Sequence, residues 1–285
     1  GGGIYVQNAS NLLIQENQIA FCSVTQKGGG IYINNGTVDI IQNTITSNYA
    51  PVGGSAVYIE DDSEVSMRGN IITNNSGEYA VWGKPHQFTK NNLFYNYDGQ
   101  NVNSNLRYTG TEDISYPYNF WGTRNDQNNI DPSIYDNNES ESVLGEVQYN
   151  PIETGASSEA PLPFTDVSAI YTTLTGNSSV VIDEVCSGGS FDIVIQGEDS
   201  NEFSQDLTEA AVLNQSNYFP LQPLCFESGS NTGEFIATVT LSEYEYNSNI
   251  DLLLAAEGDQ LTITSLTDTS FSHMVTVTNN AINFP

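Results

Sequence analysis

The chain has 285 residues and a formal net charge of −29, because 35 acidic residues stand against only six Lys and Arg. This charge disfavours nucleic acid and anionic membranes as partners. The length suits two domains, and no apolar run approaches the roughly 20 residues that span a bilayer.

The N-terminal half repeats one pattern four times, from a small or Gly-rich start, through an apolar–aromatic pair, to an asparagine. The aromatic residues are spaced by 27, 26 and 24 positions and the asparagines by 26, 27 and 22. Two markers with nearly the same period indicate a coil of short strands, each turn stacked on the next. The markers are Tyr5, Tyr32, Tyr58 and Trp82, and Asn17, Asn43, Asn70 and Asn92.

Stacked coils place like residues above one another. We therefore expect the aromatic residues to form a stack and the asparagines a ladder of paired side-chain amides. Residues two positions apart, such as Val38 and Ile40, are expected to point inward. Positions two after each ladder asparagine, Ile72 and Phe94 among them, continue the predicted core. The same alternation, counted back from Asn92, predicts that the side chain of Phe88 points outward.

The repeated motifs "GGGIY" and "N-x-I" resemble those of the right-handed parallel β-helix family, including its surface-protein members. The resemblance covers about residues 1–124 and implies an all-β fold. Two segments resemble the C-terminal end of extracellular β-helices, Asn119-Phe-Trp-Gly-Thr123 and Gly145-Glu-Val-Gln-Tyr149. The first domain is therefore predicted to span 1–152 with a C-terminal cap segment. Because residue 1 already opens a complete coil, we expect further coils upstream in a longer parent protein.

Trp121 has two interpretations, a cap over the final coil or a platform for a sugar ring. The Gly-, Ser- and Pro-containing stretch that follows predicts a linker over 153–164.

Residues 165–285 contain short runs of β-formers at the spacing of an antiparallel sandwich, for example 191–196, 234–241 and 260–265. Their order resembles an immunoglobulin-like module of secreted and surface-layer proteins. The sequence thus predicts a right-handed parallel β-helix followed by an antiparallel immunoglobulin-like β-sandwich.

All six basic residues precede residue 125, so the second half has no Lys or Arg to offset its carboxylates. This is consistent either with a solubilising acidic surface or with bound Ca²⁺, which prefers oxygen ligands. The predicted metal ligands are Asp192, Asp199, Asn201 and Asp259.

Three cysteines are present. Cys186 and Cys225 lie beside predicted strands of the second half and are predicted to form a disulfide, which would agree with an extracellular or cell-surface location. Cys22 falls among core positions of the first coil, where a buried thiol is expected.

Many parallel β-helices cleave acidic polysaccharides, a reaction that needs a base and a cation near the sugar carboxylate. Arg68 and Lys90 each lie two residues before a predicted ladder asparagine, with Asp61, Asp62 and Glu64 nearby, so they form the only cluster that we would test for catalysis. The alternative interpretation is a surface ion pair.

The sequence thus favours a piece of a large secreted, cell-surface or filament protein with a structural or adhesive role. Expected partners are neighbouring subunits and glycans, with no membrane span in this piece. The alternative is a polysaccharide-binding protein or polysaccharide lyase that acts on acidic glycans.

Overall fold

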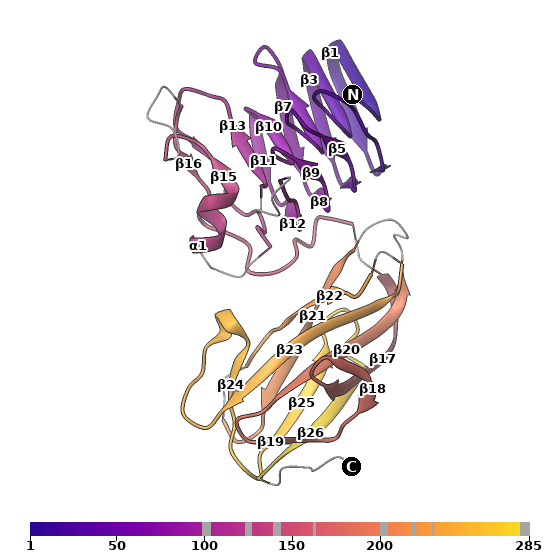
Figure 1. Cartoon of the computed structure of the whole chain (residues 1–285), viewed down its shortest axis with the longest axis vertical. Coiled ribbons are helices and arrows are strands. Elements are labelled where there is room, and N and C mark those ends of the chain that lie inside the picture. The colour runs from indigo at the N-terminus through magenta and orange to yellow at the C-terminus, as the bar shows by residue number, and fades with distance from the viewer. Residues whose placement is uncertain are drawn as a thin grey trace. The chain divides into compact units, whose positions relative to one another are not determined.

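The computed structural model describes residues 1–98, 104–122, 127–138, 144–161, 164–199, 205–217, 220–229 and 231–279. The chain divides into two compact units, residues 1–161 and 162–285 (Figure 1). Residues 153–161, which the sequence assigned to a linker, belong to the first unit. Within the described residues, no helix is long and apolar enough to cross a membrane.

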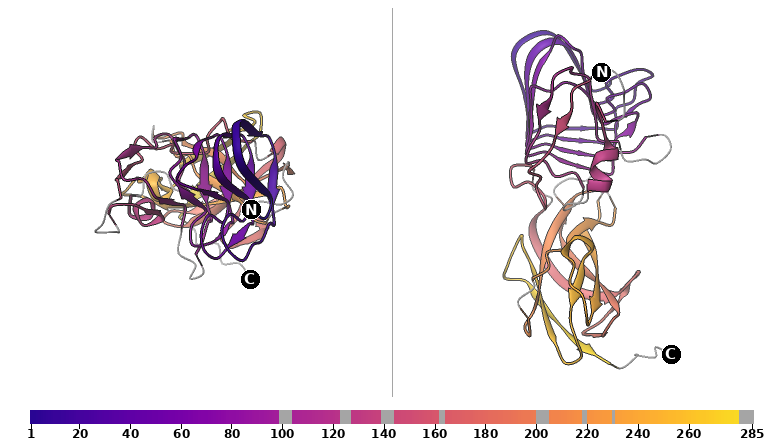
Figure 2. Two further views of the ribbon diagram at one scale, coloured as in Figure 1. Left: turned by 90° about the horizontal axis from the view of Figure 1, so that it is seen from above. Right: turned by 90° about the vertical axis from the view of Figure 1, so that its left-hand side faces the viewer.

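The first unit is a coil of parallel strands (Figure 2). Its eight-stranded sheet contains β1 (Ile4–Gln15), β3 (Ile31–Ile41), β6 (Val57–Ile59), β7 (Glu64–Arg68), β10 (Val81–Gly83), β11 (Gln87–Thr89), β13 (Leu106–Tyr108) and β15 (Ile134–Tyr135). A four-stranded sheet contains β2 (Gln18–Ala20), β4 (Thr44–Thr46), β8 (Ile71–Thr73) and β12 (Asn92–Phe94). Two small sheets pair β5 (Tyr49–Ala50) with β9 (Ser76–Gly77), and β14 (Ile114–Ser115) with β16 (Val147–Gln148). The unit also contains α1 (Gln127–Ile130) and the 3-10 turn Asp131–Ser133.

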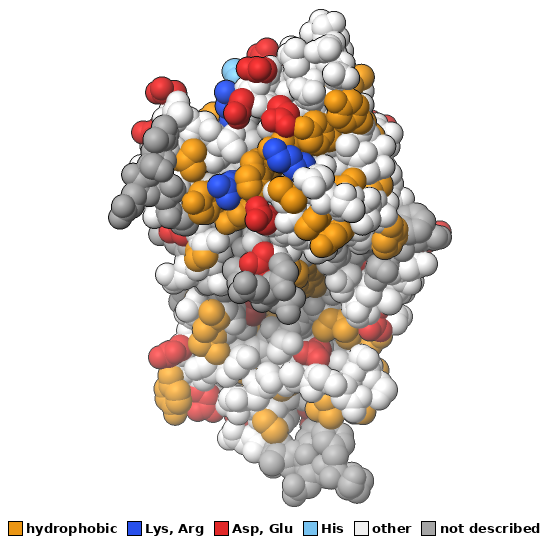
Figure 3. Space-filling view, turned by 45° about the horizontal axis from the view of Figure 1, so that its top comes forward, with side chains coloured by type: hydrophobic (Ala, Val, Ile, Leu, Met, Phe, Trp, Pro, Cys, Tyr) orange, Lys and Arg blue, Asp and Glu red, His pale blue; other side chains and the backbone are white. Residues whose placement is uncertain are grey.

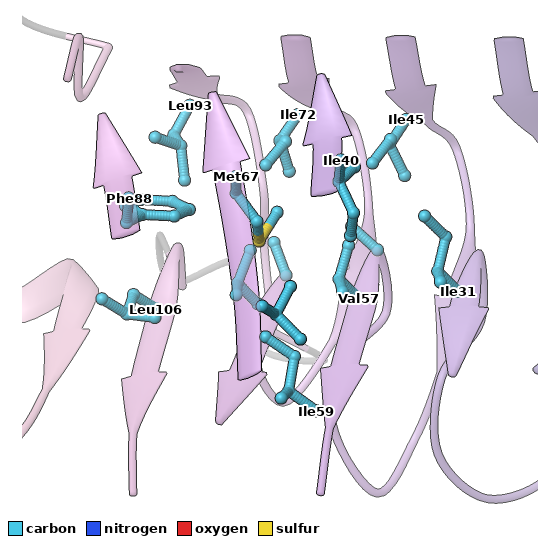
Figure 4. Close-up of a cluster of buried hydrophobic side chains, with 14 of the residues drawn as sticks. Ile31, Ile40, Ile45, Val57, Ile59, Met67, Ile72, Phe88, Leu93 and Leu106 are labelled. Atoms are coloured by element: carbon cyan, nitrogen blue, oxygen red, sulfur yellow. The ribbon is translucent and has the colours of Figure 1, made fainter. Parts of the chain in front are cut away.

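The core of the coil consists of aliphatic columns that point inward from the sheets (Figure 4). Ile45, Ile72 and Leu93 occupy equivalent register positions in β4, β8 and β12, and all three are buried. Trp121 is also buried in this core, where its ring lies against Phe88 and Tyr149. The tryptophan therefore covers the last coil from inside and is not a solvent-facing sugar platform.

An asparagine ladder, buried from Asn43 onward, runs along the coils. The backbone N–H and Nδ2 of Asn43 both donate to Oδ1 of Asn70, at 2.9 and 3.1 Å, and Asn70 donates in the same way to Asn91. Each ladder asparagine follows a residue with φ of 54 to 63°, such as Gln42 and Gly69. The ladder therefore stabilises a left-handed corner of the backbone in every coil. Its members are Asn17, Asn43, Asn70, Asn91 and Asn119.

The prediction that Asn92 belongs to this ladder is wrong by one residue. Asn91 holds the position, and Asn92 begins β12, where its Oδ1 accepts from the backbone N–H of Ser157. Because strand side chains alternate between faces, a slip of one residue reverses the expected direction of its neighbours. Phe88 is accordingly buried beside Met67, and Leu93 replaces Phe94 as the inward residue.

A second ladder was not predicted; Asn48, Asn75 and Asn96 each lie five residues beyond a member of the first ladder, and Asn105 follows Asn96. Asn48 donates to Asn75, Asn75 to Asn96, and Asn96 to Asn105, over 3.0 to 3.1 Å. Cys22 takes the corresponding place in the first coil, where its N–H donates to Oδ1 of Asn48. Two ladders thus support two corners of each coil.

The second unit is a sheet whose strand order is β18-β17-β20-β23-β22-β21-β25-β26-β19, with β24 beside β23. Because β17 contacts β25 and β26, the sheet folds over a separate hydrophobic core as a sandwich. Most pairings are antiparallel, but β19 with β26 and β23 with β24 are parallel. Its strands are β17 (Phe164–Leu174), β18 (Asn177–Val181), β19 (Glu184–Cys186), β20 (Ser190–Asp199), β21 (Leu207–Asn214), β22 (Leu224–Glu227), β23 (Glu234–Ser242), β24 (Leu252–Leu254), β25 (Gln260–Ser265) and β26 (Ser272–Thr278), with a 3-10 turn at Ser248–Ile250.

Candidate functional site

One outward row of the β-helix is aromatic. Tyr5, Tyr32 and Tyr58 stack with ring centroids 5.5 and 5.3 Å apart, and Trp82 follows Tyr58 at 6.0 Å. The residues on either side of this row, such as Ile31 and Ile33, point into the core. Most ring faces are covered by the next ring along the column, and Tyr58 is itself buried, so the column is a stack of covered rings rather than a set of flat platforms.

Arg107 and Tyr135 continue the aromatic column in β13 and β15. The guanidinium carbon of Arg107 lies 4.1 Å from the Trp82 ring centroid and 4.4 Å from that of Tyr135. Such contacts between a cation and two ring faces are favourable. The aromatic column therefore ends in a cation held between two rings.

A polar cluster flanks the middle of the aromatic column. Lys27 Nζ donates to the Tyr58 hydroxyl at 2.5 Å and lies 4.0 Å from Glu60, and Glu60 accepts from the Tyr32 hydroxyl. Burial, together with this hydrogen bond to Glu60, raises the pKa of Tyr32. Tyr32 is therefore a hydroxyl donor at neutral pH, and the charges of Lys27 and Glu60 offset each other.

The residues proposed for catalysis, Arg68 and Lys90, each form an ion pair with a different glutamate. The Arg68 guanidinium makes two hydrogen bonds to Glu159, at 2.5 and 2.9 Å, and Lys90 pairs with Glu153. Arg68 pairs in register with Thr89, not with Lys90, because of the one-residue slip described above. Both cations hold the segment 153–161, which we call the strap.

The strap crosses several coils. The Glu153 N–H donates to the carbonyl of Asn119, the Ser157 N–H to Asn92, and Gln42 Nε2 to the carbonyl of Glu159. The hydrogen bond with Arg68 lowers the pKa of Glu159, so this carboxylate is charged at neutral pH. The ion-pair interpretation thus accounts for Arg68 and Lys90, and the acids Asp61, Asp62 and Glu64 make no described contact with either.

In the second unit, carboxylate oxygens of Asp199, Asp206 and Glu227 lie within 4.8 Å of one another. They come from the end of β20, the residue before β21 and the end of β22. Asp206 and Glu227 are buried, and Glu227 accepts from the N–H groups of Asp206, Thr232 and Gly233. Burial, with a contribution from the nearby charge of Asp199, raises the pKa of Glu227.

Only Asp199 of the predicted metal ligands belongs to this carboxylate cluster. Asp192 is buried and accepts from Gly176 N–H and the Thr238 hydroxyl, and Asp259 accepts from Asn214 and Ala256 in a turn. Asp192 lies seven residues before Asp199 in the same strand, β20, and Asp259 lies in the turn before β25, so each is engaged elsewhere with its own structural partners. Asn201 lies outside the described residues. Ca²⁺ stays a prediction, and the described carboxylates able to hold it together are Asp199, Asp206 and Glu227.

The predicted disulfide between Cys186 and Cys225 is not formed. Cys186 lies in β19 at one end of the strand order, whereas Cys225 is buried in β22, and three strands separate β19 from β22. The two strands are therefore not neighbours, although each borders the same hydrophobic core. Cys22 is half-buried in the first coil, and burial raises its pKa, so it is a protonated thiol at neutral pH.

Comparison with known families assigns the first unit. The model of the right-handed β-helix region matches residues 2–154, which is more than half of the chain. No curated protein matches the chain significantly. The parallel sheets, the stacked asparagines and this match agree, and the protein belongs to the right-handed β-helix family.

Proposed function

We propose that this protein is a structural and adhesive component of a secreted, cell-surface or filament assembly, in which the β-helix is a stiff rod and the sandwich a contact module of immunoglobulin-like type. The observation that carries this proposal is the continuity of the ladders. Buried asparagines and stacked rings link each coil to the next, an arrangement that stiffens a repeat structure along its axis. A polysaccharide-related role is also consistent with a β-helix, but the rod explains more of the described side chains.

The ion pairs of the basic residues favour a structural role over a lyase activity. Lyase chemistry requires a base and a cation that reach the sugar carboxylate. Arg68, Lys90 and Lys27 are each engaged with a carboxylate of the same chain, and Arg68 and Lys90 hold the strap. These contacts give each cation a structural use.

Assembly along the rod axis has a matching surface. β1 pairs with β3 through one edge, and no described strand pairs with its other edge. An unpaired strand edge is a template for another strand. A coil from a neighbouring subunit would extend the sheets and the aromatic column at Tyr5, whose side chain is 54% exposed.

Turnover of acidic and neutral polysaccharides tests the structural role against the enzymatic one. The protein is incubated with a panel of uronate-containing and neutral polymers, and released reducing ends and unsaturated products are measured. We expect no product above that of a heat-denatured sample. Product formation by the wild type that disappears in both Arg68→Gln and Lys90→Gln would contradict the proposal and restore the lyase alternative.

A further inference from the structure

The chain contains six N-x-[ST] motifs, each of which marks an acceptor for an N-linked glycan when it lies on the surface of a secreted protein. The folded structure separates these motifs, because glycan transfer to a folded chain needs an exposed asparagine whose amide nitrogen is not already engaged. Their asparagines are Asn8, Asn35, Asn74, Asn138, Asn177 and Asn214.

Asn177 is the first residue of β18, directly after the turn from β17, and Asn177, Ser178 and Ser179 are all exposed. Oδ1 of Asn177 accepts from the Ser179 N–H at 3.3 Å and from the Ser179 hydroxyl at 2.7 Å. The hydroxyl that the motif requires therefore lies against the amide that would react. No hydrogen bond from Nδ2 of Asn177 is found among the described residues, so this nitrogen is available to form a new bond.

The turn before Asn177 is fixed and unobstructed. The Gly176 N–H donates to the buried carboxylate of Asp192 at 2.8 Å, and the Thr175 hydroxyl donates to that of Ser190 at 3.0 Å. Gly176 has a φ of 74°, and no described heavy atom, chain neighbours aside, lies within 4 Å of the place where a Cβ would stand. The motif thus has a defined position with open space beside it, where a transferase has room to bind.

Asn214 combines the same local turn with the opposite surroundings. Its Oδ1 accepts from the Ser216 N–H at 2.9 Å, as in the motif at Asn177, but Asn214 is fully buried. Its Nδ2 donates to the Leu254 carbonyl at 3.0 Å and to a carboxylate oxygen of Asp259 at 2.8 Å. Glycan transfer would break both hydrogen bonds and expose a buried side chain, so the folded chain excludes this acceptor.

The motifs of the rod lack the arrangement seen at Asn177. Nδ2 of Asn35 donates to Oδ1 of Asn8 at 2.9 Å, so these two amides are joined across adjacent coils. Among the described residues, no hydrogen bond joins the hydroxyl of either motif to its own asparagine. Asn74 is half-buried, and the motif at 138–140 lies only partly within the described residues. Asn177 is therefore the acceptor that the structure favours.

The position of Asn177 also matters for the sandwich, because β18 is an open edge. It stands at one end of the strand order and pairs with β17 alone among the described strands. Proteins protect such edges from association with other chains by charged side chains, above all Lys, or by proline. β18 contains neither a charged residue nor a proline, and Val181 is 58% exposed, whereas β19 at the other end carries Glu184.

Lysine cannot protect this edge, because all six basic residues precede residue 125. In Figure 3, the Lys and Arg side chains in view, coloured blue, accordingly lie on the first unit. A bulky, hydrophilic glycan on the first residue of β18 would supply the protection that the side chains of this strand do not.

We propose that Asn177 is the acceptor of an N-linked glycan that shields the open edge of β18. The inference rests on the secreted or cell-surface location in the proposed function, because glycan transfer to this motif acts on exported chains. In the transfer, Nδ2 of Asn177 forms a bond to the anomeric carbon of an oligosaccharide carried on a polyprenyl pyrophosphate. The bond from that carbon to the phosphate oxygen breaks, the lipid pyrophosphate leaves with the electron pair, and one Nδ2 proton passes to a base of the oligosaccharyltransferase.

Glycopeptide mass spectrometry of the native protein, isolated from the cells that make it, tests the site directly. We expect a glycan on Asn177 and none on Asn214. An unmodified Asn177 would overturn the inference. That result would contradict only this site, whereas product release in the polysaccharide assay would contradict the structural role and leave the site standing.

Transfer in vitro tests why Asn177 is chosen. The folded, unglycosylated whole chain is incubated with a single-subunit oligosaccharyltransferase that accepts N-x-[ST] and with a polyprenyl-pyrophosphate-linked oligosaccharide; the urea-unfolded chain, diluted into the assay, is the positive control. Transfer to Asn177 should be at least tenfold faster than to Asn214 in the folded chain and similar to it in the unfolded one. Ser179→Ala should abolish transfer to the intact Asn177, Ser179→Thr should preserve it, and Ser216→Ala is the matched control without effect. Equal transfer to both asparagines of the folded chain would contradict the selection.

The shielding role is measured by light scattering of the same chain before and after transfer. The Tyr5→Asp variant is used, so that association through the end of the rod does not contribute. We expect the glycosylated chain to self-associate less than the unglycosylated one. Equal self-association of the two would contradict a role of the glycan at the β18 edge.

Discussion

The β-helix and the sandwich are both built from strands, but they hold their polar groups in different ways. In the β-helix, each buried asparagine bonds to the same residue of the next coil, so polar satisfaction is repeated along the axis. In the sandwich, buried carboxylates such as Asp192 and Glu227 each have an individual set of partners. A repeat thus distributes its stability over neighbouring coils, whereas a sandwich concentrates it in contacts made once.

Truncation of a buried ring in either core should have the largest effect on stability. Phe88→Ala in the rod and Phe235→Ala in the sandwich remove fully buried rings and should each cost about 3–5 kcal/mol of unfolding free energy. Hydrogen exchange should show opening confined to the coils around β11 for Phe88→Ala and spread across the unit for Phe235→Ala. A cost below about 0.5 kcal/mol for Phe88→Ala would instead indicate an exposed ring.

The next effect tests the ladder. Asn70 is fully buried, its Oδ1 accepts from Asn43, and its Nδ2 donates to Ile40 and Asn91. Asn70→Ala leaves several buried groups unsatisfied and should cost about 3 kcal/mol. Asn92→Ala is the control, because the described hydrogen bond of the Asn92 side chain is the one that it accepts from Ser157 N–H, and this variant should cost about 1 kcal/mol. Chemical denaturation measures both, and equal costs would argue against Asn91 as the ladder residue.

A smaller effect depends on pH and is confined to the sandwich. The folded-state pKa of Glu227 is raised, mainly by burial, so folding favours its protonated form. Its contribution to stability is therefore complete below its unfolded pKa and is lost as the pH rises through its folded pKa. Glu227→Gln should reduce this loss.

Stability is measured from acidic to neutral pH in EDTA, so that no divalent cation replaces the proton. The pKa values of Asp259 and Asp268 are lowered. Their contribution to the stability of the fold is therefore lost as the pH falls, which is opposite to the behaviour of Glu227. Only the difference between wild type and Glu227→Gln isolates Glu227. A difference that grows as the pH falls would contradict the expected sign.

The smallest effect concerns the strap. Its ion pairs with Arg68 and Lys90 are partly exposed, so each should contribute at most about 1 kcal/mol and weaken with salt. Amide exchange at Ser157 should accelerate in 1 M NaCl and in the double variant Arg68→Gln, Lys90→Gln. Lys84→Gln is the control. A strap that exchanges equally in all samples would show that its backbone hydrogen bonds hold it without the ion pairs.

The coil architecture was predictable because the same residue types recur at nearly the same spacing in several coils. Tyr5, Tyr32, Tyr58 and Trp82 recur at nearly constant spacing, and the structure stacks them. The slip at Asn92 arose because two asparagines are adjacent, so the spacing alone did not choose between them. Asn48 and Asn75, each five residues after a ladder asparagine, carried the missing signal: Asn96 lies five residues after Asn91.

The candidate sites were less predictable because they join residues that no period relates. Arg68 and Glu159 are 91 positions apart, and the contacts of the strap depend on how the chain returns along the coils. Asp206 and Glu227 approach Asp199 only through the pairing of β22 with β21 and β23.

Electron microscopy of the native protein, with and without calcium, tests the structural role most directly. We expect ordered end-to-end fibres in which rods continue along the β-helix axis. A Tyr5→Asp variant, which places a charge on the exposed end of the aromatic column, should shorten or abolish them. Dispersed single particles in both conditions would contradict assembly along the rod.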